Sequence, residues 1–256
     1  MEKAELRLLW MYPDILNLHG GRGDVMAVER LCRQLGVALE VRRVNRLAER
    51  PDFTWADLLV FGPGELCVLP KVKAALLSGG GALEAYAAAG KGILCVGTTG
   101  ALFARETRRC GGASFEGLGL LDMVCTEREM PYGDDVIFRA GGLDRDVCGI
   151  QIQMVDTALA PGQEALGPVV YGHGNDGGGM EGAVRAGVVF TNALGPVLVK
   201  NPWFALWLLK KLVPALAPLP EPDDDDLSTL WELESESARA ILAFNEKKEK
   251  GHAPKA

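Results

Sequence analysis

A cysteine that ends a short apolar run is the first residue of this sequence able to do chemistry. The run Gly92-Ile93-Leu94-Cys95 leads through Val96-Gly97 into a helical pattern from Thr98 to Arg105. This order predicts a strand that turns sharply into a helix, where backbone N–H groups and the helix dipole stabilise a thiolate. The N–H of Val96 would then face a developing oxyanion. A buried structural thiol at a strand end fits the same pattern.

Two glycine-rich loops are candidates for contact with a ligand. Gly62-Pro63-Gly64-Glu65 follows another apolar run and would reach the same edge of a parallel sheet, where Gly62 and Gly64 could supply a second backbone donor. The loop from Gly172 to Gly182 holds His173, Asn175 and six glycines, which permit close approach of the backbone to a ligand. A plain turn and a mobile hairpin loop are the respective alternatives.

Apolar runs alternate with helical patterns over the first half of the chain. The runs 6–11, 39–44, 58–61 and 92–95 predict strands, and apolar residues at helical spacing predict helices over 25–35 and 72–89, the second one interrupted at Ser78 to Gly81. Strands that alternate with helices form a mostly parallel sheet flanked by helices, with the ligand site beyond the carboxyl ends of the strands. We therefore expect an α/β fold.

The second half of the chain has a different pattern. Between Gly117 and Val189, short apolar segments broken by glycines predict β-hairpins, and a final helix is expected from Asn201-Pro202. We expect one domain over residues 1–217, followed by an extended acidic Pro/Asp linker over 218–226. Residues 227–256 predict an amphipathic helix, which either folds back on the domain or docks on a partner, and a disordered end from Lys247 to Ala256.

Composition excludes several classes of function. The 27 Lys and Arg residues against 34 Asp and Glu give a net charge of −7, which argues against nucleic acid as a partner. The six cysteines show no CxxC or His-rich spacing, so we expect no metal, no cofactor and no disulfide framework, but reduced thiols in a cytoplasmic protein. The N-terminus has no signal-peptide pattern, and no apolar run reaches the roughly 20 residues that a transmembrane helix needs.

Several segments taken together resemble class I glutamine amidotransferases of the GatD type, in order along residues 6–213. These are the glutaminase subunits of lipid II isoglutaminyl synthase, and they are similar to the amidotransferase domain of cobyric acid synthase. The most specific match is the opening loop, Tyr12 to Asp24. Three further segments match, namely Gly117 to Asp122, the Gly-Asn-Asp-Gly-rich loop with Glu181-Gly182, and Gly195 to Pro202.

The resemblance implies a thiol chemistry and a partner. Cys95 would be the nucleophile that attacks the side-chain amide of glutamine, forms a thioester and releases ammonia. Arg128 and Asn175 would contact the substrate, and Cys95 would lie at the mouth of a pocket walled by the Gly62 and Gly174 loops. The ammonia would pass to a Mur-ligase-like synthetase that amidates the D-glutamate of lipid II. In cobyric acid synthase the same module serves corrinoid side chains.

The chain departs from the family at several positions. The catalytic histidine that precedes the family's Gly-Pro is Leu194 here, and leucine cannot move a proton. Without that general acid and base, a rate factor of about 10² to 10⁴ is lost. Five further positions differ in the same sense, namely Pro63 in the oxyanion loop, Ile93 before the elbow, Thr99 in place of glutamine, Met130 where arginine is expected unless Arg128 substitutes, and Gln151-Ile152-Gln153 in place of Glu-Asn-His.

Three histidines remain as possible substitutes for the missing base. His252 belongs to the end expected to be disordered, whereas His19 and His173 lie on loops. Either one would serve only if its loop folds over Cys95, because a general base must reach its proton by a hydrogen bond.

Three hypotheses of function follow. The chain is a working glutaminase subunit of a ligase, as Cys95 and the fold indicate, or it is a pseudo-amidotransferase that serves as an assembly or regulatory module, as Leu194, Thr99 and Met130 indicate. Corrinoid amidation is the third, and it would ordinarily require a synthetase domain ahead of residue 1.

Overall fold

Six strands form the first of two sheets, in the order β11-β12-β4-β3-β1-β2. The computed structural model describes residues 4–219 and 231–252, so the predicted linker lies for the most part outside the described residues. All neighbours in this sheet pair in parallel except β11, which runs antiparallel to β12. Its strands are β1 (Glu5–Met11), β2 (Ala38–Val44), β3 (Leu58–Phe61), β4 (Gly92–Val96), β11 (Ala183–Arg185) and β12 (Val188–Thr191).

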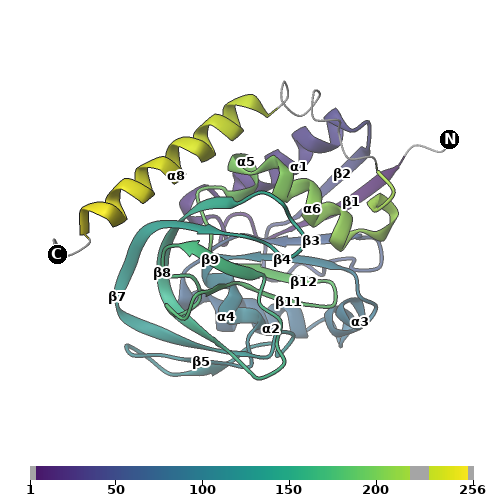
Figure 1. Cartoon of the computed structure of the whole chain (residues 1–256). Coiled ribbons are helices and arrows are strands. Elements are labelled where there is room, and N and C mark those ends of the chain that lie inside the picture. Colours follow the sequence, from purple (N-terminus) through teal and green to yellow (C-terminus); the bar gives the residue numbers. More distant parts are fainter. Residues whose placement is uncertain (1–3, 220–230, 253–256) are drawn as a thin grey trace.

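Helices cover both faces of the first sheet. Figure 1 shows α1, α5 and α6 above the sheet and α2, α3 and α4 below it. Because successive side chains of a strand point to opposite faces, Leu94 and Val96 pack with the upper helices, whereas Ile93 and Cys95 pack with the lower ones. These helices are α1 (Arg22–Gln34), α2 (Leu69–Leu77), α3 (Ala82–Ala88), α4 (Gly100–Phe103), α5 (Val197–Lys200) and α6 (Pro202–Leu212).

The helical pattern over residues 72–89 forms two helices, as its interruption indicated. Gly80 and Gly81 both adopt positive φ between α2 and α3, a conformation that glycine tolerates without strain. Four 3₁₀ turns complete the helical elements, namely Leu18–Gly20, Leu66–Val68, Gly97–Thr99 and Pro214–Leu216. Among the described residues no single helix is long and apolar enough to cross a membrane; the pair Leu66–Leu77 and Ala82–Ala88 passes on length and composition only when joined across an 88° bend.

A second, mainly antiparallel sheet is built from the hairpin-rich half of the chain. Its long hairpin pairs β7 with β8 and has an irregularity between Glu127 and Tyr132. The path β10-β9-β7-β5-β6 completes it, with one parallel pair, β5 and β7. Its strands are β5 (Glu106–Arg108), β6 (Phe115–Glu116), β7 (Met123–Phe138), β8 (Val147–Leu159), β9 (Gly167–Tyr171) and β10 (Met180–Glu181).

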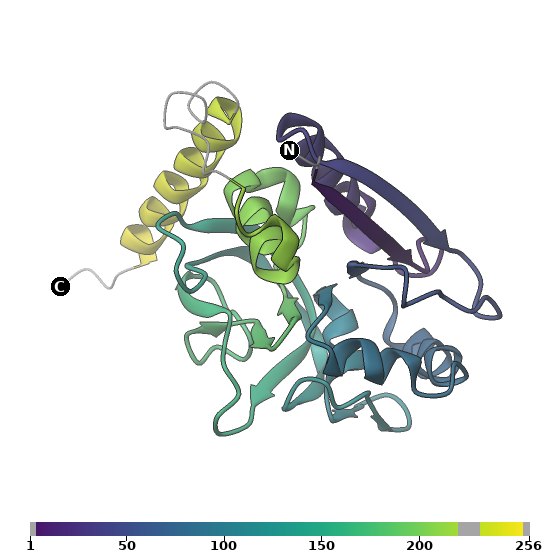
Figure 2. The same cartoon turned by 90° about the vertical axis from the view of Figure 1, so that its right-hand side faces the viewer.

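The tail helix α8 (Glu232–His252) folds back along α5 and β8, and Figures 1 and 2 show it along one side of the domain. Trp231, just before it, is buried. Polar contacts dominate the seam: Arg30 donates to Glu234, Asn245 to Asp135, and Lys248 to Asp134. The helix continues to His252, so the expectation of disorder from Lys247 is wrong for 247–252, because the helical pattern carries on through the charged residues.

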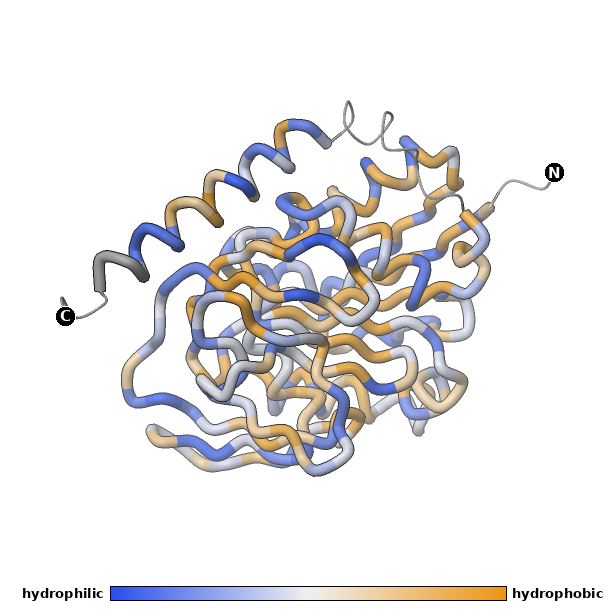
Figure 3. The backbone as a smooth tube through the Cα atoms, in the orientation of Figure 1, coloured by the Kyte–Doolittle hydropathy of each residue, from blue (hydrophilic) through white to orange (hydrophobic). Residues whose placement is uncertain are grey.

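The apolar residues concentrate where the two sheets and the helices meet. Figure 3 shows long hydrophobic stretches along the strands in the middle of the molecule and an alternation of hydrophilic and hydrophobic residues along α8. The predicted α/β fold, with a mostly parallel sheet flanked by helices, is therefore confirmed for the first sheet.

Candidate active site

The turn that follows β4 has a glycine at its apex. Val96 is still extended, whereas Gly97 adopts φ +64° and begins the turn that leads into α4. A sharp strand-to-helix turn of this kind is where an enzymatic nucleophile is lifted above a sheet edge. An L residue pays for this backbone conformation with strain, and glycine does not. The apex in this chain therefore carries no side chain at all.

Cys95 lies two residues before that apex, inside β4. It pairs with Phe61 on one side and Phe190 on the other. Its side chain is 0% exposed in the core below the sheet, and its thiol donates to the Val189 carbonyl at 3.4 Å. Burial, and secondarily the neighbouring Cys125, raises the pKa of the Cys95 thiol well above its usual value. This placement corrects the expectation of a reachable thiol at the elbow.

Leu194 faces the glycine apex and not the cysteine. A Cβ atom built on Gly97 would come within 2.9 Å of Cδ2 of Leu194 and 3.1 Å of Cβ of Pro63. The backbone of Leu194 is fixed by two hydrogen bonds with Ile150, of 2.8 and 3.1 Å. The residue at the position of the family histidine thus opposes Gly97, and neither member of the pair can attack a carbonyl or carry a proton.

The predicted oxyanion residues Gly62, Gly64 and Val96 all pack within the protein. The Gly64 N–H donates to Oγ1 of Thr98 at 3.1 Å, and that hydroxyl donates back to the Gly64 carbonyl. Gly62 packs against the opening loop, since a Cβ there would lie 2.5 Å from the Leu16 carbonyl oxygen. Val96 remains a strand residue paired with Thr191. The Gly62-Gly64 loop does reach the turn, as predicted, but its Gly64 donor is not free.

A cavity of about 350 Å³ opens beside the turn. The cavity is lined by Gly64 of the predicted loop, by Leu194 at the position of the family histidine, and by the candidate base His19. Thr98 of the turn also lines it. Its lining is Leu18, His19, Pro63, Gly64, Glu65, Leu66, Cys67, Thr98, Arg109, Glu127, Ile152, Met154 and Leu194. Neither Cys95 nor the loop at Gly174 is part of that lining, which corrects the expected pocket walls.

The cavity also contains an ion pair that sequence reasoning missed. Arg109 donates two hydrogen bonds of 3.1 Å to the two carboxylate oxygens of Glu127. The N–H groups of Cys110 and Gly111 donate to the same carboxylate, and the bonds from Arg109, the largest cause, lower the pKa of Glu127 to about 2. No sequence signal joins these residues, because they are 18 positions apart on different elements.

Arg128 and His173 lie together but outside this cavity. Arg128 donates to both oxygens of Asp156, at 2.5 and 2.6 Å, and Nε2 of His173 lies 3.0 Å from Asp156. The imidazole also stacks on the ring of Tyr132, with centroids 4.8 Å apart. This cluster attaches the glycine-rich loop to β7 and β8, so the geometry gives Arg128 a structural partner in place of the predicted substrate.

Asn175 is likewise part of the scaffold. It is 2% exposed; its Nδ2 donates to the Gly182 carbonyl, and its Oδ1 accepts from the Gly182 N–H and from Nδ2 of Asn192. Asn192 in turn donates to the fully buried Glu181 through its backbone N–H, at 2.6 Å, and its side chain, at 3.1 Å. The polar atoms of this loop are saturated by the protein itself.

Comparison with known proteins agrees with this arrangement of elements. No family model matches the chain. Over 203 residues the chain is 24% identical to the lipid II isoglutaminyl synthase (glutamine-hydrolyzing) subunit GatD of Streptococcus pneumoniae (strain ATCC BAA-255 / R6), which covers 77% of this chain and 76% of the relative. The chain is therefore similar to a GatD-type glutamine amidotransferase subunit over about three quarters of its length.

Solved structures support the fold of this amidotransferase-like chain. The crystal structure of a glutamine amidotransferase overlays with a TM-score of 0.54 at 15% identity, covering 80% of this chain and 98% of that one. A structure of PurLQS from Thermotoga maritima gives 0.48 at 10% identity, over 74% and 86% of the two chains, which is too low to support an inference. The amidotransferase-like fold is thus kept, while the turn where a nucleophile would stand carries glycine.

Proposed function

We propose that this chain is a GatD-like subunit that does not hydrolyse glutamine and that binds a Mur-ligase-like synthetase as an assembly or regulatory partner in the amidation of lipid II D-glutamate. The observation that carries the proposal is the pair at the turn: Gly97 stands at the apex, and Leu194 borders it so closely that a Cβ atom on Gly97 would lie 2.9 Å from Cδ2 of Leu194. The similarity to a subunit of lipid II isoglutaminyl synthase supports the choice of pathway and of a partner subunit.

Hydrolysis through Cys95 is the alternative, and it conflicts with two physical requirements. A thiolate is the attacking species, and a thiol whose pKa burial raises holds very little thiolate at neutral pH. The substrate must also reach the sulfur, which is closed off by the sheet and the lower helices. Exposing it would require β4 to separate from β3 and β12, the two strands that flank it in the centre of the sheet.

An ammonia-release assay tests the proposal. The full chain is purified alone and together with a candidate Mur-ligase-like synthetase, and ammonia from glutamine is measured for the intact chain and for Cys95→Ala. We expect equal background rates for the two proteins in both settings. Glutamine-dependent release that the substitution abolishes would overturn the proposal.

The partner role needs a separate readout. The synthetase is supplied with ATP, acceptor and ammonium salt, and amidation is followed with and without this chain. We expect the two proteins to copurify and the rate or yield with ammonium to change when the chain is present, while glutamine does not replace ammonium. Failure to copurify, together with an unchanged reaction, would contradict the assignment of the partner.

A further inference from the structure

A cavity of about 510 Å³ lies between the body of the domain and α8, away from the turn at Gly97. Trp203 forms its floor, and its indole Nε1 donates to the Asp146 carbonyl at 3.1 Å. The walls come from two elements: Arg145 and Asp146 from the body at the start of β8, and Glu232, Ser235, Ala238, Arg239 and Leu242 from α8. The cavity therefore exists only while α8 is docked.

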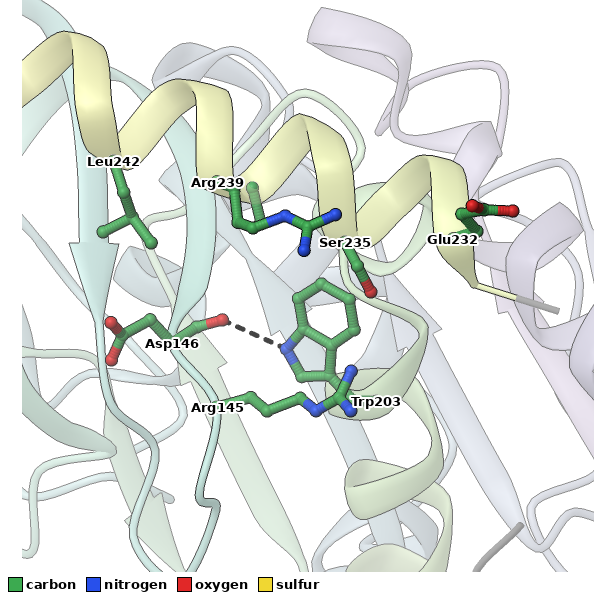
Figure 4. Close-up of a pocket in the computed structure, with 8 residues that line it drawn as sticks. Arg145, Asp146, Trp203, Glu232, Ser235, Arg239 and Leu242 are labelled. Atoms are coloured by element: carbon green, nitrogen blue, oxygen red, sulfur yellow. Dashed lines mark hydrogen bonds between the residues drawn. The ribbon is translucent and has the colours of Figure 1, made fainter. Parts of the chain in front are cut away.

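Two guanidinium groups line this cavity, Arg145 from the body of the domain and Arg239 from α8. Figure 4 shows Arg239 and Arg145 extending toward the indole of Trp203 from either side, with the hydroxyl of Ser235 beside it. The guanidinium carbon of Arg145 lies 5.6 Å from the centroid of the ring. Within residues 4–219 and 231–252, neither Arg145 nor Arg239 has a carboxylate partner within ion-pair distance.

The two acidic side chains that line the cavity do not neutralise these arginines. Asp146 accepts two hydrogen bonds from Arg139, of 2.9 and 2.7 Å, and in Figure 4 its carboxylate points away from the indole. Glu232 stands at the first residue of α8, at the far end of the cavity. Two positive charges thus border a space that is partly open to solvent, with Arg239 exposed and Arg145 half-buried, in a chain whose net charge is −7.

The chemistry of the lining indicates the ligand. Planar guanidinium groups pair with phosphate and carboxylate oxygens through two parallel hydrogen bonds, and a serine hydroxyl adds a further donor. Two arginines, one from each wall, match a ligand of about two negative charges, with acceptor oxygens on more than one side. A phosphate group has that charge and tetrahedral shape at neutral pH, whereas a carboxylate is planar and carries one charge.

We propose that Arg145, Arg239 and Ser235 bind a phosphate-class oxyanion, either free or as part of a small phosphorylated molecule, and that the bound anion holds α8 against the domain. The contacts of α8 with the domain are mainly hydrogen bonds and ion pairs, with Ala238, Leu242 and Trp231 as the apolar part. A charge-assisted bridge between Arg145 on the body and Arg239 on the helix would add to a weakly attached element.

The test is calorimetric titration of the full chain with pyrophosphate and with inorganic phosphate at constant ionic strength. We expect saturable binding that Arg145→Gln and Arg239→Gln each weaken at least about tenfold, and Ser235→Ala less. Arg185→Gln, an exposed arginine on β11 outside the cavity, is the matched control and should leave binding unchanged.

A second measurement separates this site from general attraction of anions to the surface. Amide hydrogen exchange over Ser235 to Leu242 should slow when pyrophosphate is added to the intact chain, and this slowing should be absent in Arg145→Gln. Binding that both arginine variants retain, or a dicarboxylate that binds as tightly as pyrophosphate, would overturn the proposal. So would the absence of any saturable binding at millimolar pyrophosphate.

Discussion

The turn at Gly97 and the glycine-rich loop over 172–182 differ in the side chains that surround them, which are apolar at the turn and polar at the loop. The turn is bordered by Leu194 and Pro63, whereas the loop is held by the hydrogen bonds of Asn175, Glu181 and Asn192. The residues that contact the two regions are close in the chain. Asn192 donates hydrogen bonds to Asn175 and Glu181 of the loop, and Leu194, two residues later, faces the turn. The loop is therefore held by a network of polar groups, whereas the turn is bordered by apolar side chains that can neither attack a carbonyl nor carry a proton.

The physical reason lies in what each region needs for stability. Glu181 is fully buried, and burial raises its pKa, so the fold requires its three hydrogen-bond donors from Thr191 and Asn192. Leu194 is also buried, at 3% exposure, but an aliphatic side chain there is stabilising and needs no partner. A leucine at position 194 is therefore compatible with a stable fold, whereas loss of the loop network would destabilise it.

The largest expected effect is the loss of stability when the hydrogen-bond network of the glycine-rich loop is removed. Glu181→Ala would leave the hydroxyl of Thr191 and both Asn192 donors without their acceptor, and we expect the free energy of unfolding to fall by about 3–5 kcal/mol. Urea denaturation measures it. Asp176→Ala is the control, because this exposed residue of the same loop only accepts from the Gly178 N–H. A loss for Glu181→Ala as small as that of the control would refute the role given to the network.

The next effect is a dependence of the unfolding free energy on pH, which arises from Asp24 where it contacts the segment that follows Leu194. Asp24 is buried and accepts from the Leu198 N–H at 2.8 Å, and burial raises its pKa from 3.8 to about 7. Between about pH 4 and pH 7 the folded chain therefore holds a proton that the unfolded chain has lost, so stability falls as the pH rises through this window.

Asp24→Asn removes this titration and keeps an acceptor for the Leu198 N–H. We expect the variant to lose less stability than the wild type between pH 5 and pH 8, by a few kcal/mol at most, as measured by urea denaturation at each pH. Parallel pH profiles for the two proteins would show that Asp24 is not the group responsible.

A thiol introduced at position 97 tests whether a side chain at the apex of the turn is accessible from the cavity. Gly97→Cys should fold with a loss of at least about 1–2 kcal/mol, because a side chain at φ +64° is strained and its Cβ would lie 2.9 Å from Cδ2 of Leu194, which has to shift. The introduced thiol should react readily with iodoacetamide, since the turn borders the cavity that Thr98 and Leu194 line. Gly97→Ser controls for the strain without adding a thiol. An introduced thiol as inert as Cys95 would contradict the position given to the apex.

The smallest effect concerns Cys95 itself. Cys95→Ala removes one buried sulfur and its weak bond to the Val189 carbonyl, so we expect a loss of about 1 kcal/mol in thermal or urea unfolding. A much larger loss would show that the thiol has a structural role beyond packing.

Sequence patterns were sufficient for most elements of the first sheet and not for the apex of its turn. The buried runs at β3 and β4 are recognisable because they hold no charged or polar residue, and β1 is recognisable although Arg7 interrupts it. Because its residues are all apolar, β4 does not reveal which side chains face which helices. The position of the apex depends on the left-handed backbone of Gly97, and the sequence offered Val96-Gly97 as its only clue. The cavity's Arg109 and Glu127 come from separate elements, which local spacing cannot join.

Modification of the native chain by a glutamine-mimicking electrophile, mapped by peptide mass spectrometry, tests the central claim most directly. The exposed thiol of Cys110, which does not line the cavity beside the turn, reports the background rate of modification. Our account predicts that Cys95 stays unmodified in the native protein, with or without the synthetase, and reacts only after unfolding. Modification of native Cys95 faster than that background, and blocked by added glutamine, would contradict it.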